Sequence, residues 1–349
     1  MERPRKQEQE RATTEVVEVG PGVVRTQLPI QMPGLGHVNM YVIEDDRGVA
    51  VVDPGLPGKT TWSAVQDRLK QAGVPLRRVH TVIVTHSHPD HFGAAGRLAE
   101  ETGADLMTHA AFHNPWLRQH DHGELDEVDP EDLQANTFRG PTPWGTERFR
   151  PPLRRRLMFR AMHLPFVKMF VPPKPTRRVL DGEVLKLAGR EWFAVHTPGH
   201  TLDHLCLHDP EGGLLLSGDH VLPTITPHIA GIGAGRDPLK AFNDSLDKVA
   251  ALADVTTVLP AHGHPFGNLS ERVDDIKRHH VERLEQLHEI INSSGPSTVT
   301  ELSHHLFRKA RWGHMAESET YAHLEHMRLA GEAERYEENG QVLYRVAQT

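Results

Sequence analysis

A short segment rich in metal-binding side chains constrains this chain more than any other feature: Thr85-His86-Ser87-His88-Pro89-Asp90-His91. It follows residues 81–85, a β-branched run typical of a buried strand. The segment is therefore expected in a loop at the carboxyl end of a strand, where α/β proteins place their sites. Imidazole and carboxylate groups together suit Zn²⁺, or another divalent ion such as Mn²⁺ or Fe²⁺. The sequence thus predicts a metal site in this loop.

Three further residues of ligand type follow later strand signals. His200 lies in Thr-Pro-Gly-His-Thr, Asp219 in Ser-Gly-Asp-His and His262 in Pro-Ala-His-Gly, each in a turn. Together with the first segment, they resemble the metal-binding pattern of the metallo-β-lactamase superfamily over roughly residues 23–268. All seven ligand positions of that pattern are filled.

The resemblance implies an α/β fold, an αββα sandwich with the metals at one edge of two facing sheets. It also implies two divalent ions, zinc in the first place and manganese or iron as alternatives. The first ion would be held by His86, His88 and His200, and the second by Asp90, His91 and His262, with Asp219 bridging them. Strict β-lactamases of the superfamily usually have Cys in place of the bridging acid. Asp219 therefore indicates the hydrolase branches, such as glyoxalase II, thioesterases, lactonases and RNA-processing nucleases.

This ligand set predicts the chemistry. Two divalent ions about 3.5 to 4 Å apart can lower the pKa of a shared water to near 7, which makes hydroxide available as the nucleophile. Asp90 can orient that nucleophile or pass on its proton, so Asp90 and Asp219 are the candidate catalytic residues. We expect hydrolysis of an ester, thioester or lactone-type small molecule, with acidic or acylated compounds as candidates. The alternatives are a metal-dependent ribonuclease and an iron-dependent sulfur dioxygenase, whose single-iron site would not need all seven ligands.

The length of 349 residues predicts two domains. Strand and helix signals alternate over residues 16–278, the predicted metallo-β-lactamase-fold domain. Residues 279–349 are predicted to form three helices and a hairpin with Asn339-Gly340 at its tip, the order of a winged-helix-like domain. The third helix carries Glu317, Glu319 and Glu325, where a helix that reads a DNA groove would carry basic or amide side chains. Packing or homodimerisation is therefore favoured over nucleic-acid binding.

Residues 112–180 interrupt the strand–helix order and are predicted to be a helical insertion. An acidic part comes first, and the basic residues of 139–178 alternate there with apolar side chains. One interpretation is a lid whose arginines are solvated and neutralised by the acidic part. The other is a basic, apolar-lined cover that holds an acidic or acylated substrate, touches a membrane surface, or contacts phosphates.

The N-terminus lacks the apolar stretch of a signal peptide, so residues 1–15 are predicted to be a disordered, solvated leader and the cytoplasm is the expected location. No apolar run approaches the length of a membrane span. The net charge of −8 argues weakly against generic nucleic-acid binding. The single cysteine, Cys206, lies in an apolar alternation and is expected in a buried strand.

Several other polar residues are assigned supporting roles. His228, in the loop after Asp219, is the best candidate for a substrate contact, and Asp53 is expected to be structural near the metals. Hydrogen bonding to the site or a surface position, rather than metal ligation, is expected for His109, His113, His220 and His264. The pairs His279-His280 and His304-His305 are expected to face solvent.

Overall fold

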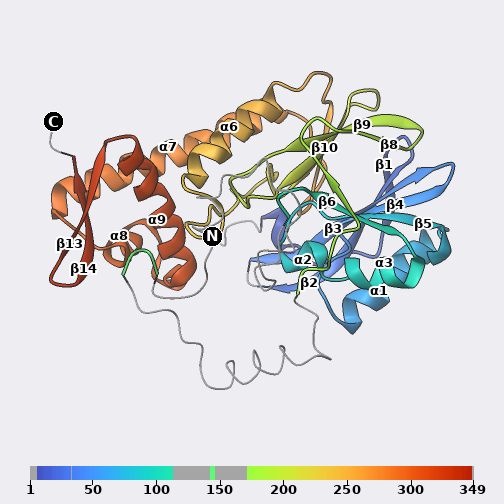
Figure 1. The fold of residues 1–349 in the computed structure, drawn as a ribbon, viewed down its shortest axis with the longest axis horizontal. Helices are drawn as coiled ribbons and strands as arrows, with labels where there is room; N and C mark the ends of the chain where they lie inside the picture. Colours follow the sequence, from blue (N-terminus) through green and yellow to red (C-terminus); the bar gives the residue numbers. More distant parts are fainter. Residues whose placement is uncertain (1–5, 33, 113–141, 146–170, 348–349) are drawn as a thin grey trace, which may run out of the picture.

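Two β-sheets face each other in the computed structural model, which describes residues 6–32, 34–112, 142–145 and 171–347 (Figure 1). Neighbours in the first sheet follow the chain order. Its strands are β1 (Val16–Gly20), β2 (Val23–Met32), β3 (Leu35–Asp45), β4 (Gly48–Val52), β5 (Val79–Ile83), β6 (Asp105–His109) and β7 (Arg177–Val179). The second sheet has the order β12 (Thr257–Pro260), β11 (Leu214–Gly218), β10 (Leu205–Asp209), β9 (Arg190–His196) and β8 (Val184–Leu187).

Strand β4 shows why the first sheet is covered on both faces. All five of its residues are buried, and successive side chains of a strand point to opposite faces. Val49 and Val51 pack in the cluster that includes helix α1 (Lys59–Gln71). Ala50 and Val52 pack instead in the core between the two sheets. A strand that is apolar on both faces must be covered on each side. Here helix α1 covers one face and the second sheet covers the other.

Helices form the outer layers of the sandwich. Helices α1, α2 (Pro89–Phe92) and α3 (Ala95–Thr102) lie on the first sheet, with the 3₁₀ turn η2 (Leu76–Arg78) leading into β5. Helix α6 (Pro238–Ala250) and the start of α7 (Leu269–Ser294) pack on the second sheet through Phe242 and Ile276. The architecture is the αββα sandwich that the resemblance implied.

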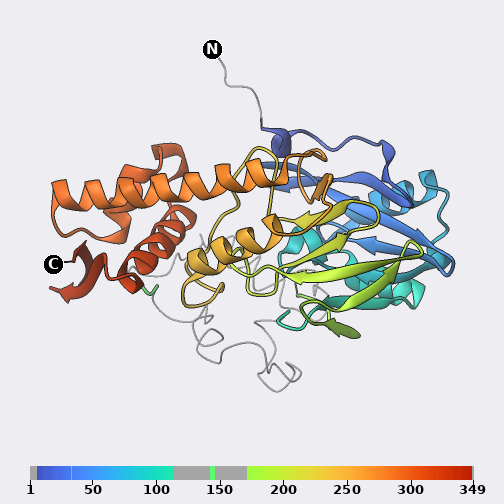
Figure 2. The same cartoon turned by 90° about the horizontal axis from the view of Figure 1, so that it is seen from above.

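Helix α7 continues from the sandwich into the C-terminal unit (Figures 1 and 2). Its residue Ile276 belongs to the core of the second sheet, whereas Leu287 and Ile291 belong to the C-terminal core. The predicted domain boundary between residues 278 and 279 thus lies inside one continuous helix. The remaining elements of the unit are α8 (Val299–Leu306), η5 (Lys309–Arg311), α9 (His314–Leu329), β13 (Ala333–Glu338) and β14 (Gln341–Val346).

The predicted C-terminal hairpin is confirmed. Strands β13 and β14 pair antiparallel, and Asn339 and Gly340 connect them with φ angles of 51° and 75°. Two successive positive φ angles are what a two-residue type I′ turn requires, and Asn-Gly adopts them at little cost. Tyr344 and Met327 lie in the core that this hairpin forms with the helices.

The prediction of a disordered, solvated leader is wrong at Gln7–Gln9, although Lys6 and Glu10 are exposed as expected. Residues Gln7–Gln9 form a 3₁₀ turn, η1, and the Glu8 side chain is fully buried. Its carboxylate accepts hydrogen bonds from the backbone N–H groups of Thr224 and Ile225, at 2.8 and 3.1 Å. We call residues 6–10 the N-terminal strap. High charge in the sequence suggested solvation, but the acid meets donors that lie more than 200 residues away.

Two other expectations also fail. Residues Arg177–Val179 lie in the predicted helical insertion, yet they form strand β7, which pairs parallel with β6. His280, expected to face solvent, is 1% exposed, and its Nδ1 lies 3.1 Å from Nε2 of His323 on α9. The reason is that α7 runs from the sandwich into the C-terminal unit, so the middle of the helix is covered. His304 and His305 are exposed as expected.

Most of the predicted insertion, residues 113–141 and 146–170, lies outside the described residues, and with it most of the basic 139–178 stretch and His113. In the part of the chain that is described, no helix is both long and apolar enough to cross a membrane.

Candidate metal centre

Four strands of the sandwich deliver the predicted ligands to one edge. In the second sheet, β9 and β11 both run antiparallel to β10, and β12 runs parallel to β11. The carboxyl ends of β9, β11 and β12 therefore point the same way. The loops that follow these three strands carry His200, Asp219 and His262, respectively. The loop after β5, in the first sheet, carries His86 and His88, whereas Asp90 and His91 lie in the short helix α2 that follows and not in the loop expected from the sequence. The seven residues thus come together because each follows the end of a strand.

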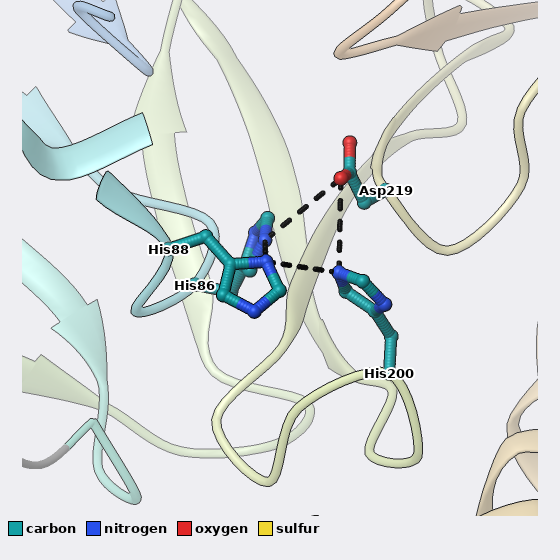
Figure 3. Close-up of side chains that lie close together, drawn as sticks. All are labelled: His86, His88, His200 and Asp219. Atoms are coloured by element: carbon teal, nitrogen blue, oxygen red, sulfur yellow. Dashed lines mark hydrogen bonds and ion pairs between the residues drawn. The ribbon is translucent and has the colours of Figure 1, made fainter. Parts of the chain in front are cut away.

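The first ligand group consists of His86, His88, His200 and Asp219 (Figure 3). Nδ1 of His88 lies 2.9 Å from Nε2 of His86 and 3.1 Å from Nε2 of His200. Oδ2 of Asp219 lies 4.0 Å from Nε2 of His86 and 3.7 Å from Nε2 of His200. Three imidazole nitrogens and one carboxylate oxygen therefore face one point.

The second group consists of Asp90, His91 and His262. Oδ2 of Asp90 lies 3.7 Å from Nε2 of His91 and 3.5 Å from Nε2 of His262. Asp219 also reaches this group, with Oδ2 at 3.6 Å from Nε2 of His91 and Oδ1 at 3.3 Å from Nε2 of His262. The Asp219 carboxylate accordingly lies between the two groups.

Both groups fit a divalent metal ion. Four ligand atoms at about 2.0–2.1 Å from a tetrahedral Zn²⁺ lie about 3.3 Å from one another, close to the separations found here. Three of the converging atoms, His91 Nε2, His262 Nε2 and Asp219 Oδ1, are buried without a hydrogen bond. Buried polar atoms without a partner are costly, and a metal ion would satisfy all three.

The second group is oriented by residues at the ends of strands. Nδ1 of His91 donates to Oδ2 of Asp53 at 2.8 Å, directly after β4. Thr85 donates to the same carboxylate through its N–H, at 2.9 Å, and through its hydroxyl, at 2.7 Å. Nδ1 of His262 donates to the carbonyl oxygen of His37, on β3, at 2.6 Å. These bonds direct both Nε2 atoms toward the carboxylates, which is the usual support of a ligating imidazole.

The histidines of the first group are held in their neutral form. Burial of the ring, reinforced by the neighbouring His200, lowers the pKa of His88 to about 3. Burial likewise lowers the pKa of His86, well below its usual value, and the pKa of His200. A neutral imidazole has a free lone pair, which is what a metal ligand needs.

The second group has the opposite electrostatics. Burial disfavours the charged ring of His262, but the carboxylates of Asp219 and Asp90 outweigh it and raise its pKa to about 10. Burial would raise the pKa of Asp90, yet His91 and His262 hold it below its usual range. The carboxylates of Asp90 and Asp219 thus favour a positive charge between them and the two histidines. A metal ion would compete with protons for this position.

His204 is a supporting residue that the sequence analysis missed. His204 is fully buried, and its Nε2 accepts a hydrogen bond from the backbone N–H of Asp219 at 3.0 Å. Its Nδ1 then carries the proton and donates to the hydroxyl of Thr197 at 2.7 Å. Gly218 has φ of 51°, and a Cβ there would lie 2.6 Å from His204 Nε2. The only cue in the sequence was a second histidine four residues after His200.

The remaining predicted residues lie around the centre in different ways. His228 approaches it through its backbone, since its carbonyl oxygen accepts from Nδ1 of His200 at 2.8 Å. His264 contacts the strap, with Nε2 at 2.9 Å from the Glu10 carboxylate. The His109 ring is buried and stacks on His196 with ring centroids 3.7 Å apart. His220 is buried beside Phe242, and Cys206 is buried in β10 as predicted.

Known proteins resemble the chain over most of its length. The sequence pattern of the metallo-beta-lactamase superfamily matches residues 33–262. An acyl-coenzyme A thioesterase from Gallus gallus, MBLAC2, is 28% identical over 69% of this chain and 83% of its own length. A hydroxyacylglutathione hydrolase from Albidiferax ferrireducens is 26% identical over 69% of this chain and 68% of its own length. A metallo-beta-lactamase family protein from Thermus thermophilus has a similar solved structure, with a TM-score of 0.70 and 29% identity over 93% of this chain and 99% of its own.

The fold, the seven converging side chains and these likenesses agree, and the chain belongs to the metallo-β-lactamase superfamily. Within that superfamily it is a metallohydrolase, with relatives named as a thioesterase and as a hydroxyacylglutathione hydrolase.

Proposed function

We propose that this chain is a dinuclear metal-dependent hydrolase of small acyl compounds. The observation that carries the proposal is the position of the Asp219 carboxylate. Its Oδ2 lies 3.7 Å from Nε2 of His200 and 3.6 Å from Nε2 of His91, and its Oδ1 lies 3.3 Å from Nε2 of His262. A carboxylate shared by two ligand groups can hold two ions side by side.

The two ions have different ligand sets in this proposal. The first is held by His86, His88 and His200, the second by Asp90, His91 and His262, and Asp219 is common to both. A set rich in imidazole suits zinc, and the same ligands also accept manganese or iron.

The bound ions would supply hydroxide at neutral pH and polarise the acyl carbonyl of the substrate. The chain itself supplies the orientation of the reacting groups. Asp90 is 4% exposed, and His91 and His262 hold its pKa below the usual range, so it stays a carboxylate at neutral pH. An ionised carboxylate can only accept hydrogen bonds, so Asp90 is suited to orient the attacking water molecule.

We assign the substrate to the esters, thioesters and lactones, with thioesters first. Support comes from the two relatives named for acyl-coenzyme A and for hydroxyacylglutathione. His228, which is partly exposed and whose carbonyl oxygen accepts from His200, is proposed as a substrate contact. A cytoplasmic location, a winged-helix-like domain over residues 279–349 and homodimerisation through it remain predictions.

The test uses the full chain, freed of metal and reloaded with Zn²⁺, Mn²⁺ or Fe²⁺. Hydrolysis of acyl-coenzyme A of several chain lengths, a hydroxyacylglutathione, an acyl-homoserine lactone and labelled single-stranded RNA would be measured. Asp90→Ala is the site variant. Asp244→Ala is the matched control, because this acid is exposed on α6 and pairs only with Lys240 among the described residues.

We expect thioester cleavage by the wild type and by Asp244→Ala, with a bound metal content of two ions per chain and loss of activity in Asp90→Ala. Cleavage of RNA alone would replace the proposal by a nuclease. A chain that binds one iron and consumes oxygen with a persulfide would replace it by a sulfur dioxygenase.

A further inference from the structure

The loop between β11 and α6, residues 219–237, connects the metal centre with the C-terminal unit. At its start lies Asp219, and further along lies His228, which makes contacts in two directions. The His228 carbonyl oxygen accepts from Nδ1 of His200 at 2.8 Å, while its own ring Nδ1 lies 3.0 Å from Oε2 of Glu319 on α9. A carboxylate can only accept, so the ring of His228 donates from Nδ1 in this contact.

Helix α9 holds the same loop at two more points. The N–H of Gly231 donates to the hydroxyl of Ser318 at 3.0 Å. The backbones are close here, since a Cβ on Gly231 would lie 2.6 Å from the carbonyl oxygen of Ser318. Further along, Nδ1 of His326 lies 3.1 Å from both carboxylate oxygens of Asp237. The loop is thus fixed along one side of α9.

The contact with Glu319 is well shielded. Its side chain is 17% exposed, and that of His228 is 24% exposed. An acid in this position would ordinarily be costly to bury, but the imidazole beside it provides a hydrogen bond in return. On the same helix, Glu317 has other partners, the indole N–H of Trp144 and the hydroxyl of Thr300. Of these two acids, Glu319 is the one directed to the loop of the metal centre.

We propose that Glu319 is a positioning residue of the metal centre: through His228 it fixes the carbonyl oxygen that orients His200. The inference rests on the proposed function, because it takes His200 as a ligand of the first ion. A carbonyl that accepts from Nδ1 sets both the tautomer and the direction of a ligating imidazole. That carbonyl belongs to a loop rather than to a strand, so its position depends on what holds the loop. The C-terminal unit is therefore part of the catalytic apparatus.

The experiment measures the affinities of the metal-free full chain for both ions, by titration with Zn²⁺ against a chromophoric chelator. We expect Glu319→Ala to lower the affinity for one of the two ions by about 10–100-fold, which is the usual cost of losing a residue that supports a ligand. Glu319→Gln keeps an oxygen that accepts from His228, so it is expected to restore most of the affinity. Glu317→Gln, the matched control on the same helix, should leave both affinities unchanged.

A second readout separates positioning from simple stability. In the Co²⁺-loaded protein, the Nδ1–H proton of a coordinating histidine gives a shifted NMR signal. We expect one such signal to move or to exchange faster with water in Glu319→Ala. A double-mutant cycle with His228→Ala should be non-additive, because the two side chains act through one contact.

Glu319→Ala with wild-type affinity for both ions and unshifted signals, but a lower melting temperature, would overturn the inference and leave a purely structural contact. Should Glu319→Ala fail to fold, His228→Ala gives the same test from the other partner. A wild type that binds no second ion would instead count against the proposed function, so the two failures are distinguishable.

Discussion

The second ligand group is supported by the sandwich itself, whereas His200 of the first group depends on a loop that the C-terminal unit anchors. His91 donates to Asp53, directly after β4, and His262 donates to the carbonyl of His37, on β3 of the first sheet. His200 donates to the carbonyl of His228, which α9 holds through Glu319. Sheets are rigid and loops are not, so the same chemical arrangement is secured in two physically different ways. One half of the centre is built into the core fold, and the other can be altered from outside it.

The largest effect is expected from Asp219→Ala, since this carboxylate belongs to both halves. Its removal takes one ligand from each ion and leaves Asp90, at 3.5 Å, as the carboxylate that still faces Nε2 of His262. We expect a loss of metal affinity and of kcat/KM of more than about 100-fold, beyond the range for residues that only support ligands. Metal analysis after dialysis and steady-state kinetics would measure both. Retention of two ions would show that the halves do not share Asp219.

Asp53→Asn tests the half that the sandwich supports. The substitution keeps the shape of the side chain, and Asn tolerates the φ of 52° found at this position. It removes the negative charge of the carboxylate whose Oδ2 lies 2.8 Å from Nδ1 of His91. We expect the second ion to bind about 10–100-fold more weakly, and the first ion to be affected less, because Asp53 reaches His86 only through the hydroxyl of Thr85. Equal weakening of both ions in a Zn²⁺ titration would contradict the division into two separately supported halves.

The seven side chains that converge at the candidate metal centre could be picked out from the sequence because each lies in a short motif after a strand. Four of them fall within six residues, and Pro-Gly-His, Ser-Gly-Asp and Pro-Ala-His are turns with local signatures. The alternation of strands and helices was readable because their periodicities are local, and the αββα sandwich was implied by the family resemblance that these motifs carry. The C-terminal hairpin was equally readable from Asn339-Gly340.

The supporting residues could not be predicted in this way. The bond between His262 and the His37 carbonyl joins residues 225 positions apart, and a backbone acceptor leaves no trace in residue type. Glu8 and Glu319 look like ordinary charged residues of a leader and of a helix, and only the folded chain brings them to the loop after β11. The exposure of His280 was predicted wrongly because His280 lies on a long helix that joins two cores. The pattern of apolar residues within one unit does not reveal that the other unit covers this part of the helix.

Glu8→Ala tests whether the loop has an anchor besides α9. The variant would leave the partly buried N–H groups of Thr224 and Ile225 without their acceptor. We expect the free energy of unfolding to fall by about 1–3 kcal/mol, the usual cost of unsatisfied buried donors. Urea denaturation would measure it, with Glu15→Ala as control, since that acid is exposed. An unchanged stability would mean that α9 and the sandwich fix the loop without the N-terminal strap.

The smallest effect is expected from His326, the third contact between the loop and α9. The hydrogen bond to Asp237 outweighs partial burial and raises the pKa of His326 above 6.5. A raised pKa in the folded state means that the contact contributes fully below about pH 6.5, and that its contribution is lost as the pH rises through the folded-state value. At pH 6, His326→Ala should be less stable than the wild type by up to about 1 kcal/mol, and by less at pH 9. Urea denaturation at both pH values would measure this difference. A gap that stays constant or widens toward pH 9 would show that the ring acts by packing alone, and the loop would then depend on Ser318 and Glu319 for its polar contacts with α9.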